Sequence, residues 1–315
     1  MTKKILLSGV KPTGRPHIGN YFGAMKQFVD LQNDYQAYVM IADLHALTTV
    51  QNTEEMRQMT RDLVLDYLAI GLDPENVVLF KQSEVSAHAE LAWVFDCITT
   101  MPYLMRAHAF KDSEAKNKEI NVGVFNYPML MAADILLYDA DVVPVGKDQK
   151  QHIEYARDTA QKFNNTFNIE LFKLPEDLII ESVETVPGTD GQKMSKSYKN
   201  TIPLFATDEE IEKAVMGIVT DSGSDIPENV YAIHKLFRDE AELKALYEEH
   251  KGKYKALKDA LAEDIKNFIK PMRERREKFT SQPDLVKKII DQGNKKANEV
   301  AQAKLREIKR AVGVL

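Results

Sequence analysis

The residues Lys11–Asn20, KPTGRPHIGN, form a turn whose composition points to ligand binding. They follow the apolar run Ile5–Val10 and precede an amphipathic, helix-like stretch. In a parallel sheet, ligands bind beyond the carboxyl ends of the strands, where the first N–H groups of a helix point outward. A glycine there lets a nucleotide approach the backbone closely, and His17 and Asn20 would offer hydrogen bonds. The stretch is neither a P-loop nor G-x-G-x-x-G, so it predicts another kind of nucleotide-binding turn.

A second stretch, GTDGQKMSKS at residues 188–197, places Lys193 and Lys196 three positions apart in a glycine-flanked loop. Lysines held in this way can neutralise the charge that develops on a transferring phosphoryl group. A lysine–serine loop on its own is more often a solvated turn. Together with the first turn, it predicts phosphoryl chemistry.

The elements that must position these residues are indicated by hydrophobic periodicity. Apolar, strand-like runs occupy Lys4–Val10, Ala37–Ala42, Val77–Gln82 and Val142–Val145. Helical spacing covers Ile18–Gln32, Glu54–Ile70 and Gln149–Phe163. This alternation predicts an α/β fold with a Rossmann-like parallel sheet covered by helices. The interval 87–126 is too long for an ordinary crossover and is expected to hold a helical insertion.

The chain after about residue 205 loses its strand-like runs and shows helical, charge-rich patterns. These patterns cover Glu209–Val219, Asn229–His250, Tyr254–Phe279 and Leu285–Val312. A proline at position 271 is expected to interrupt or kink the third of them. We therefore expect two domains, with residues 1–200 forming the nucleotide-binding domain and residues 201–315 forming an all-α domain.

The charge is unevenly distributed along the chain. The formal net charge is −6, yet residues 265–315 contain 14 Lys and Arg against 6 Asp and Glu, a surplus of +8. The preceding residues must therefore carry −14. An acidic body with a basic end is compatible with docking a polyanion at one place, although lysines and arginines also simply solvate helix faces.

Composition excludes several classes of protein. Hydrophobic and charged fractions of 44% and 29% are those of a globular protein, and no stretch is long enough to span a bilayer. The first apolar run is too short for a signal peptide, so we expect a cytoplasmic protein without a membrane partner. The presence of only one cysteine, Cys97, excludes an internal disulfide. We expect Cys97 to lie in the core and Trp93 to have a packing role. No histidines show metal-ligand spacing, so we expect no protein-held metal site.

Several motifs carry a resemblance to a known family. The sequences PHIGN and KMSKS resemble the two signatures of class I aminoacyl-tRNA synthetases. The blocks YPMLMAADILLYDADVVPVGKDQKQHIE, IADLHALTT and GNYFGAMKQFVDLQ are similar to tryptophanyl-tRNA synthetases. The likeness covers almost the whole chain and is strongest in residues 5–200.

The resemblance implies residues for ATP. His17, Lys111, Lys193 and Lys196 match catalytic positions. The matching ATP-binding positions are Lys11, Pro12, Thr13, Gly19, Asn20, Gly146, Lys147, Asp148, Val186, Lys193, Met194, Ser195, Lys196 and Ser197. Two departures are visible. Lys11 stands where glutamine is common, and the continuation after the lysine loop, YKNTIPLF, is less usual.

The resemblance also implies a tryptophan pocket. Asp134 matches the carboxylate that accepts the indole N–H, and the indole ring requires one acceptor within an apolar wall because its nitrogen only donates. Its alternative role as a solvated helix acid conflicts with its apolar neighbours. His45 could serve the site or be structural. The other matching pocket positions are Gly9, Tyr127, Met131, Val143, Val145 and Gln149.

The function implied is that of a tryptophan–tRNA ligase. L-Tryptophan would be activated with ATP, with Mg²⁺ bound through the ATP phosphates, and transferred to the 3′ end of tRNA(Trp). The family further implies a homodimer and a C-terminal domain that binds the anticodon. The uneven charge, not the family, leads us to expect that phosphates are contacted by the basic cluster Arg273, Arg275, Arg276 and Lys278. The alternatives are a tyrosyl-tRNA synthetase, a small-molecule nucleotidyltransferase and a non-catalytic paralogue that binds RNA.

Overall fold

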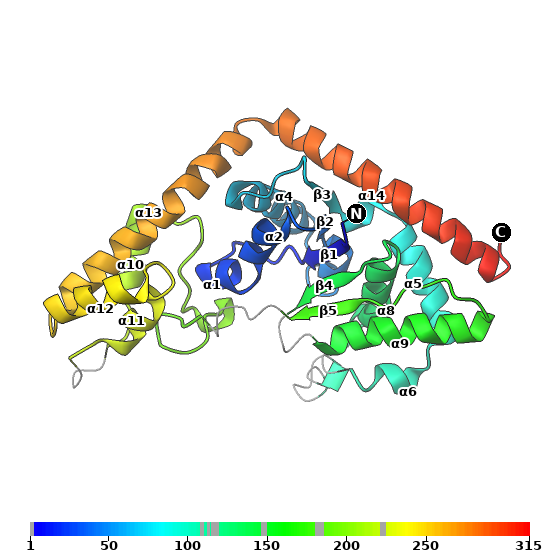
Figure 1. Cartoon of the computed structure of the whole chain (residues 1–315), viewed down its shortest axis with the longest axis horizontal. Coiled ribbons are helices and arrows are strands. Elements are labelled where there is room, and N and C mark those ends of the chain that lie inside the picture. The colour runs from blue at the N-terminus through cyan, green and yellow to red at the C-terminus, as the bar shows by residue number, and fades with distance from the viewer. Residues whose placement is uncertain are drawn as a thin grey trace.

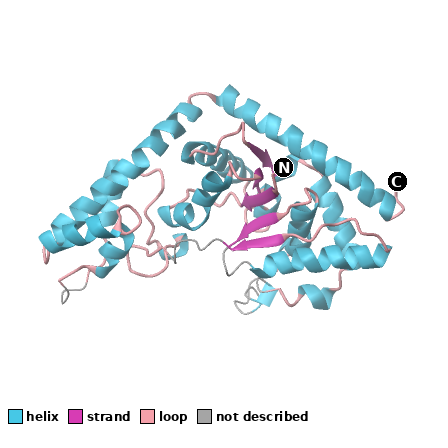
Figure 2. Cartoon of the chain, viewed as in Figure 1, coloured by secondary structure: helices cyan, strands magenta, loops and turns pink. Residues whose placement is uncertain are grey.

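The computed structural model describes residues 3–107, 110, 111, 114, 120–145, 150–179, 186–220 and 225–315. Its centre is a five-stranded sheet of order β3-β2-β1-β4-β5 in which every pairing is parallel. Helices surround this sheet (Figures 1 and 2). The strands are β1 (Ile5–Val10), β2 (Gln36–Ile41), β3 (Val77–Lys81), β4 (Val142–Val145) and β5 (Glu176–Ile179). The predicted α/β class is confirmed.

The fifth strand, β5, was not predicted. Its sequence EDLI begins with two acids and therefore lacks the apolar run of the other four strands. It pairs only with β4, with Val142 opposite Glu176, so it forms one edge of the sheet. An edge strand needs less apolar side chain than a central one, which removes the signal that periodicity relies on.

The helices of the first half lie close to the predicted ranges. The stretch after the first turn divides into α1 (Ile18–Asn20), a π-helical turn η1 (Tyr21–Met25) and α2 (Lys26–Leu31). They are followed by α3 (Asp43–Ala46) and α4 (Thr53–Ile70). Asn52 caps α4 by accepting from the backbone N–H of Glu55, and Gly71 ends it with φ of 108°.

The interval expected to hold an insertion is helical where the structure describes it. A 3₁₀ turn η2 (Gln82–Glu84) precedes it, α5 (Ala87–Ile98) and α6 (Met101–Leu104) lie within it, and α8 (Val122–Leu136) begins at its end. The next helix, α9 (Lys150–Phe167), follows β4. Two expectations for α5 were wrong: Cys97 is exposed and Trp93 is 70% exposed. Both belong to the outer face of α5, since Leu91 and Phe95 occupy the buried face.

Each face of the sheet has its own core, because successive residues of a strand point to opposite sides. Along β2, Ala37, Val39 and Ile41 join the core formed with α2, α4 and part of the C-terminal helices. Tyr38 and Met40 join the core formed with α5, α8 and α9. The sheet is therefore covered on both faces, as a parallel sheet requires.

The second half of the chain is helical. It contains α10 (Asp208–Met216), α11 (Glu228–His234), α12 (Glu240–Glu249), α13 (Tyr254–Thr280) and α14 (Pro283–Ala311). The expected interruption at Pro271 does not occur, because α13 continues through it to Thr280. In Figure 1, α13 and α14 meet at an angle above the sheet, and α14 leads the chain back across it. Within the described residues, none of the helices has the length and apolarity to cross a bilayer.

The helix α14 packs on the edge strand β3. The side-chain Oδ1 of Asn294 accepts a hydrogen bond of 2.9 Å from the N–H of Lys81. A Cβ on Gly293 would stand 1.8 Å from the carbonyl oxygen of Leu79, so only glycine permits this approach. The helix thus covers backbone groups at the edge of the sheet, which would otherwise be exposed, and packs the C-terminal half of the chain against the sheet.

The basic cluster of α13 makes contacts within the chain. Arg276 binds Asp66 at 2.7 Å and Asp62 at 2.8 Å, both in α4. Arg275 donates to the carbonyl of Ala69, and Arg273 donates to the carbonyl of Ala206 and to Asp208. The guanidinium groups of these three arginines hold α13 against neighbouring elements, and their contact with RNA phosphates stays a prediction.

Candidate active site

The site predicted from sequence lies at the point where the strand order reverses. Strand β1 pairs with β2 on one side and with β4 on the other, so the segments that leave β1 and β4 diverge. In open parallel sheets, ligands bind at such a switch point. The segment after β4, with the predicted residues Gly146, Lys147, Asp148 and Gln149, lies outside the described residues.

The turn after β1 is closed by a reciprocal cap. The ring Nδ1 of His17 accepts from the N–H of Asn20 at 3.2 Å, and the Oδ1 of Asn20 accepts from the N–H of His17 at 3.1 Å. Burial, together with the charge of Lys196, lowers the pKa of His17 to about 4. The imidazole is therefore neutral at pH 7. Because Nδ1 accepts, the proton resides on Nε2, which can donate to a ligand oxygen.

The lysine loop lies directly against this turn. The Nζ of Lys196 donates to the carbonyls of Thr13 and Gly14 at 2.9 and 3.0 Å. Behind it, the N–H of Ile18 donates to the carbonyl of Ile202 at 3.0 Å. Two motifs about 180 residues apart in sequence are thus joined by backbone and side-chain hydrogen bonds.

Gly19 lies between the two motifs. A Cβ at this position would stand 2.9 Å from Nδ1 of His17 and 3.3 Å from the Cβ of Met194. Met194 is buried, and its N–H donates to the carbonyl of Val186 at 2.9 Å. The glycine is therefore required by packing alone, in addition to any approach of a nucleotide.

The lysine loop is held by Asn200, which sequence reasoning missed. Its Nδ2 donates to Asp190 at 2.7 Å and to the carbonyl of Lys193 at 3.1 Å, and its Oδ1 accepts from the N–H of Ser195 at 2.8 Å. It is 2% exposed. Asn200 thus fixes the backbone around the exposed side chains of Lys193 and Ser197. The asparagine belongs to the unusual continuation noted above, which was the available signal.

Asp134 lies in a buried polar cluster, 2% exposed. Its Oδ2 contacts Nε2 of His45 at 2.9 Å, and its Oδ1 contacts Nδ1 of His88 at 2.5 Å. The amide nitrogen of Gln82 donates to both oxygens, at 2.8 and 3.0 Å. Burial raises the pKa of Asp134, but the electrostatic effect of His88 and the hydrogen bonds from both histidines outweigh it, so the pKa lies below its ordinary value.

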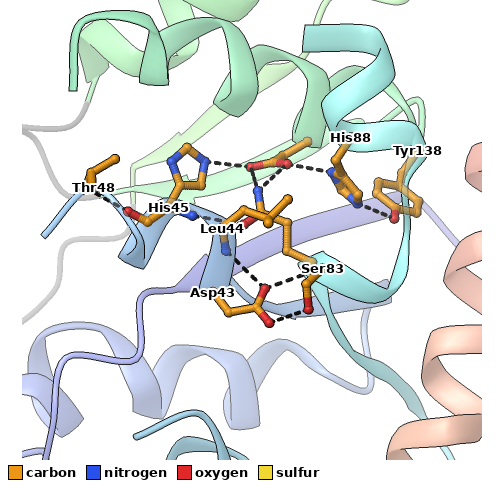
Figure 3. Close-up of polar contacts among 9 residues, drawn as sticks. Asp43, Leu44, His45, Thr48, Ser83, His88 and Tyr138 are labelled. Carbon is orange, nitrogen blue, oxygen red and sulfur yellow. Dashed lines mark hydrogen bonds and ion pairs between the residues drawn. The ribbon is translucent and has the colours of Figure 1, made fainter. Parts of the chain in front are cut away.

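The surroundings of Asp134 come from several elements. His45 belongs to α3, His88 to the first turn of α5, and Tyr138 follows α8 (Figure 3). The carboxylate of Asp43 accepts from the N–H and hydroxyl of Ser83, at 2.9 and 2.5 Å, and so joins the segments after β2 and β3. Gln82, His88 and Tyr138 were missed as parts of this site, because only tertiary contacts bring them to Asp134.

One face of α8 carries the predicted pocket residues. Tyr127, Met131 and Asp134 stand at spacings of four and three residues, which places them on one side of a helix. The Nζ of Lys11 lies 5.8 Å from the ring centroid of Tyr127, and the ring of His45 lies 6.3 Å from it. The turn after β1 therefore reaches the wall formed by α8.

The remaining predicted residues are less closely associated. Val143 is buried and Val145 half-buried on β4 beside β1. Gly9 and Thr13 are exposed, and Pro12 is buried. Lys111 is exposed, and in the part of the chain that the structure describes no contact joins it to the other predicted residues. The hydroxyls of Ser195 and Ser197 lie 2.7 Å apart.

Comparison with known proteins agrees with this architecture. Residues 2–277 match the family described as tRNA synthetases class I (W and Y). A tryptophan–tRNA ligase of Fusobacterium nucleatum is 47% identical over 317 residues, covering 98% of each protein. One of Rhodopirellula baltica is 44% identical over 98% of this chain and 99% of that protein.

Among solved structures, a tryptophanyl-tRNA synthetase of Campylobacter jejuni complexed with ADP and tryptophan has a TM-score of 0.92. Its sequence identity is 42%, and the alignment covers 98% of this chain and 99% of that one. The family match and these full-length relatives agree, and the resemblance noted in the motifs is confirmed. The chain belongs to the tryptophan–tRNA ligase family of class I tRNA synthetases.

Proposed function

We propose that this chain activates L-tryptophan with ATP and transfers it to the 3′ end of tRNA(Trp). In the first step, the carboxylate of tryptophan attacks the α-phosphate of ATP and expels pyrophosphate. In the second, a ribose hydroxyl of the terminal adenosine attacks the tryptophanyl carbonyl and releases AMP. The observation that supports this proposal most is the contact of Lys196 with the carbonyls of Thr13 and Gly14, which brings the lysine loop against the turn after β1.

On the ATP side, His17 would donate from Nε2 to a nucleotide oxygen, and Gly19 and Asn20 would line the backbone approach. Lys193 and Lys196 would stabilise charge on the transferring phosphoryl group, together with Lys111. Lys196 spans two backbone carbonyls in the structure, so phosphate oxygens can replace these acceptors when ATP binds. Catalysis would consist of positioning and electrostatics, without a covalent enzyme intermediate.

Mg²⁺ would enter with ATP. Among the described residues, no group of three or more His, Cys, Asp or Glu side chains could hold a metal ion. We therefore propose a cation that is coordinated mainly by phosphates and water, as Mg²⁺ usually is at nucleotide sites. When bound, it would offset the phosphate charge beside the two lysines.

On the tryptophan side, Asp134 would accept the indole N–H, and Tyr127, Met131, Val143 and Val145 would form the apolar wall. The carboxylate has about four acceptor positions, and the contacts of His45, Gln82 and His88 occupy them, so the indole N–H would replace one of these contacts, such as the 3.0 Å contact with Gln82. The Nδ1 of His45 is buried without a partner among the described residues, so it offers a second acceptor beside Tyr127.

The protein would act as a homodimer. Trp93, Met101 and Val122 are 70%, 66% and 73% exposed, and all three belong to the helical insertion or the start of α8. Where exposed apolar side chains lie together in one patch, they mark a surface that a partner covers. A second copy of this chain is the partner proposed here.

Pyrophosphate exchange with each of the twenty amino acids, followed by charging of tRNA(Trp), tests the function. We expect exchange that depends on tryptophan and transfer to tRNA(Trp). Exchange with tyrosine instead would identify the tyrosyl alternative. Exchange without transfer to any tRNA would favour a small-molecule nucleotidyltransferase, and no exchange at all a non-catalytic paralogue.

A further inference from the structure

Asp134 ends a chain of three buried side chains, and the proposed reaction does not use the other two. The hydroxyl of Tyr138 lies 2.9 Å from Nε2 of His88, whose Nδ1 lies 2.5 Å from Oδ1 of Asp134. Tyr138, His88 and Asp134 are 1%, 0% and 2% exposed. Figure 3 shows Tyr138 and His88 side by side at the end of this network.

The hydrogen bonds along this chain have one direction. An ionised carboxylate only accepts, so Nδ1 of His88 donates to Asp134. In the neutral imidazole, Nε2 is then an acceptor, and the hydroxyl of Tyr138 donates to it. Burial and the charge of Asp134 raise the pKa of Tyr138, which keeps its hydroxyl protonated. Tyr138 thereby selects the tautomer of His88 in which Nδ1 carries the proton and can donate to Asp134.

A second hydrogen-bonded series of a tyrosine, a histidine and an aspartate differs from the first in the partners of its carboxylate. Tyr247, His234 and Asp264 form it, with distances of 3.3 and 2.7 Å from the two ring nitrogens of His234. There the carboxylate also pairs with Arg238. Among the described residues, no lysine or arginine pairs with Asp134, so its charge depends on the N–H groups of Gln82, His45 and His88.

We propose that His88, oriented by Tyr138, is a positioning residue for tryptophan selection. It keeps Asp134 ionised and turned so that an acceptor position faces the indole N–H. With the other tautomer of His88, two lone pairs would oppose each other across 2.5 Å and turn the carboxylate away. This inference rests on the proposed role of Asp134 in the pocket.

The experiment measures pyrophosphate exchange by the full chain with two substrates. One is L-tryptophan, and the other is 3-benzothienyl-L-alanine, in which sulfur replaces the ring N–H. We expect Tyr138→Phe and His88→Leu to raise the KM for tryptophan on the order of tenfold, with little change in kcat. The KM for the analogue should stay at the wild-type value. His88→Asn, whose amide can place an N–H near the position of Nδ1, should restore most of the preference for tryptophan.

The matched control is Tyr247→Phe, which breaks the second chain and should leave the preference unchanged. Equal losses for tryptophan and the analogue, or no loss in Tyr138→Phe, would overturn the inference. If His88→Leu fails to fold, Tyr138→Phe decides alone, since it keeps the buried ring. Asp134→Asn, together with the wild type, distinguishes a failure of the proposed tryptophan pocket from a failure of the proposed function. Wild-type exchange with tryptophan but an unchanged preference in Asp134→Asn would reject the pocket, whereas absent exchange in the wild type would reject the function.

Discussion

At the residue scale, Lys196 is expected to act chiefly in the transition state. Its ammonium spans two carbonyls of the opposite turn, where phosphate oxygens would replace them. We expect Lys196→Ala to slow adenylate formation, by about 100-fold or more, and to change tryptophan affinity little. Single-turnover kinetics separate the two quantities. The control is Lys199→Gln in the same loop, and an unchanged activation rate with weaker tryptophan binding in Lys196→Ala would contradict the assignment.

A second prediction at this scale concerns His17 and pH. Its folded-state pKa of about 4 lies below the ordinary 6.5, so the unfolded chain binds the proton first. Its contribution to stability is present above pH 6.5 and is lost as the pH falls towards 4. His17→Asn keeps a capping side chain without a titrating group. Urea unfolding at pH 7 and pH 4.5 gives the free energy of unfolding that each protein loses between these pH values. We expect this loss to be smaller in the variant than in the wild type, by about 2 kcal/mol. Equal losses would show that His17 is not held neutral.

At the element scale, the docking of α14 on β3 depends on Gly293. Because a Cβ would meet the Leu79 carbonyl, Gly293→Ala must displace the helix or the strand, at a cost of about 1–3 kcal/mol. Denaturant unfolding measures this cost. Gly23→Ala is the matched control, since a Cβ there meets nothing within 4 Å. A Gly293→Ala variant as stable as the wild type would show that α14 docks elsewhere.

At the scale of the whole molecule, Arg276 joins α13 to the helix α4 beside the sheet. Burial raises the pKa of Asp66 to about 6 although Arg276 opposes the rise, so an unpaired Asp66 would be costly when ionised. We expect Arg276→Gln to destabilise the chain by about 2–4 kcal/mol at pH 8 and by less at pH 5, where Asp66 takes up a proton. Thermal unfolding at both pH values checks this. Adding Asp66→Asn should recover much of the loss, and a loss independent of pH would exclude the buried charge as its cause.

Assembly is the other property at this scale. If Trp93, Met101 and Val122 are covered by a second copy, Trp93→Lys should shift the chain to a monomer. Sedimentation velocity over a concentration series measures this shift. Trp93→Phe, which keeps an apolar ring, serves as the control. A wild type that is monomeric at every concentration would reject the proposed dimer.

The sequence by itself determined the local features of this protein. The four apolar strands, the helices between them and the two signature motifs follow from short-range patterns, and so does the family. The roles of individual site residues, the boundary between domains at residue 200 and the contacts with tRNA(Trp) stay predictions.

Tertiary structure decided the features that depend on distant residues. Asn200 holds the lysine loop, and His88 and Tyr138 reach Asp134, through contacts that no spacing rule contains. The arginines of α13, which a charge pattern assigns to RNA, pair with α4 and the start of α10. Trp93, which composition assigns to the core, faces outward. In each case the physical reason is the same, because burial and pairing are set by the neighbours that the fold supplies, and these are separated by up to 214 residues in sequence.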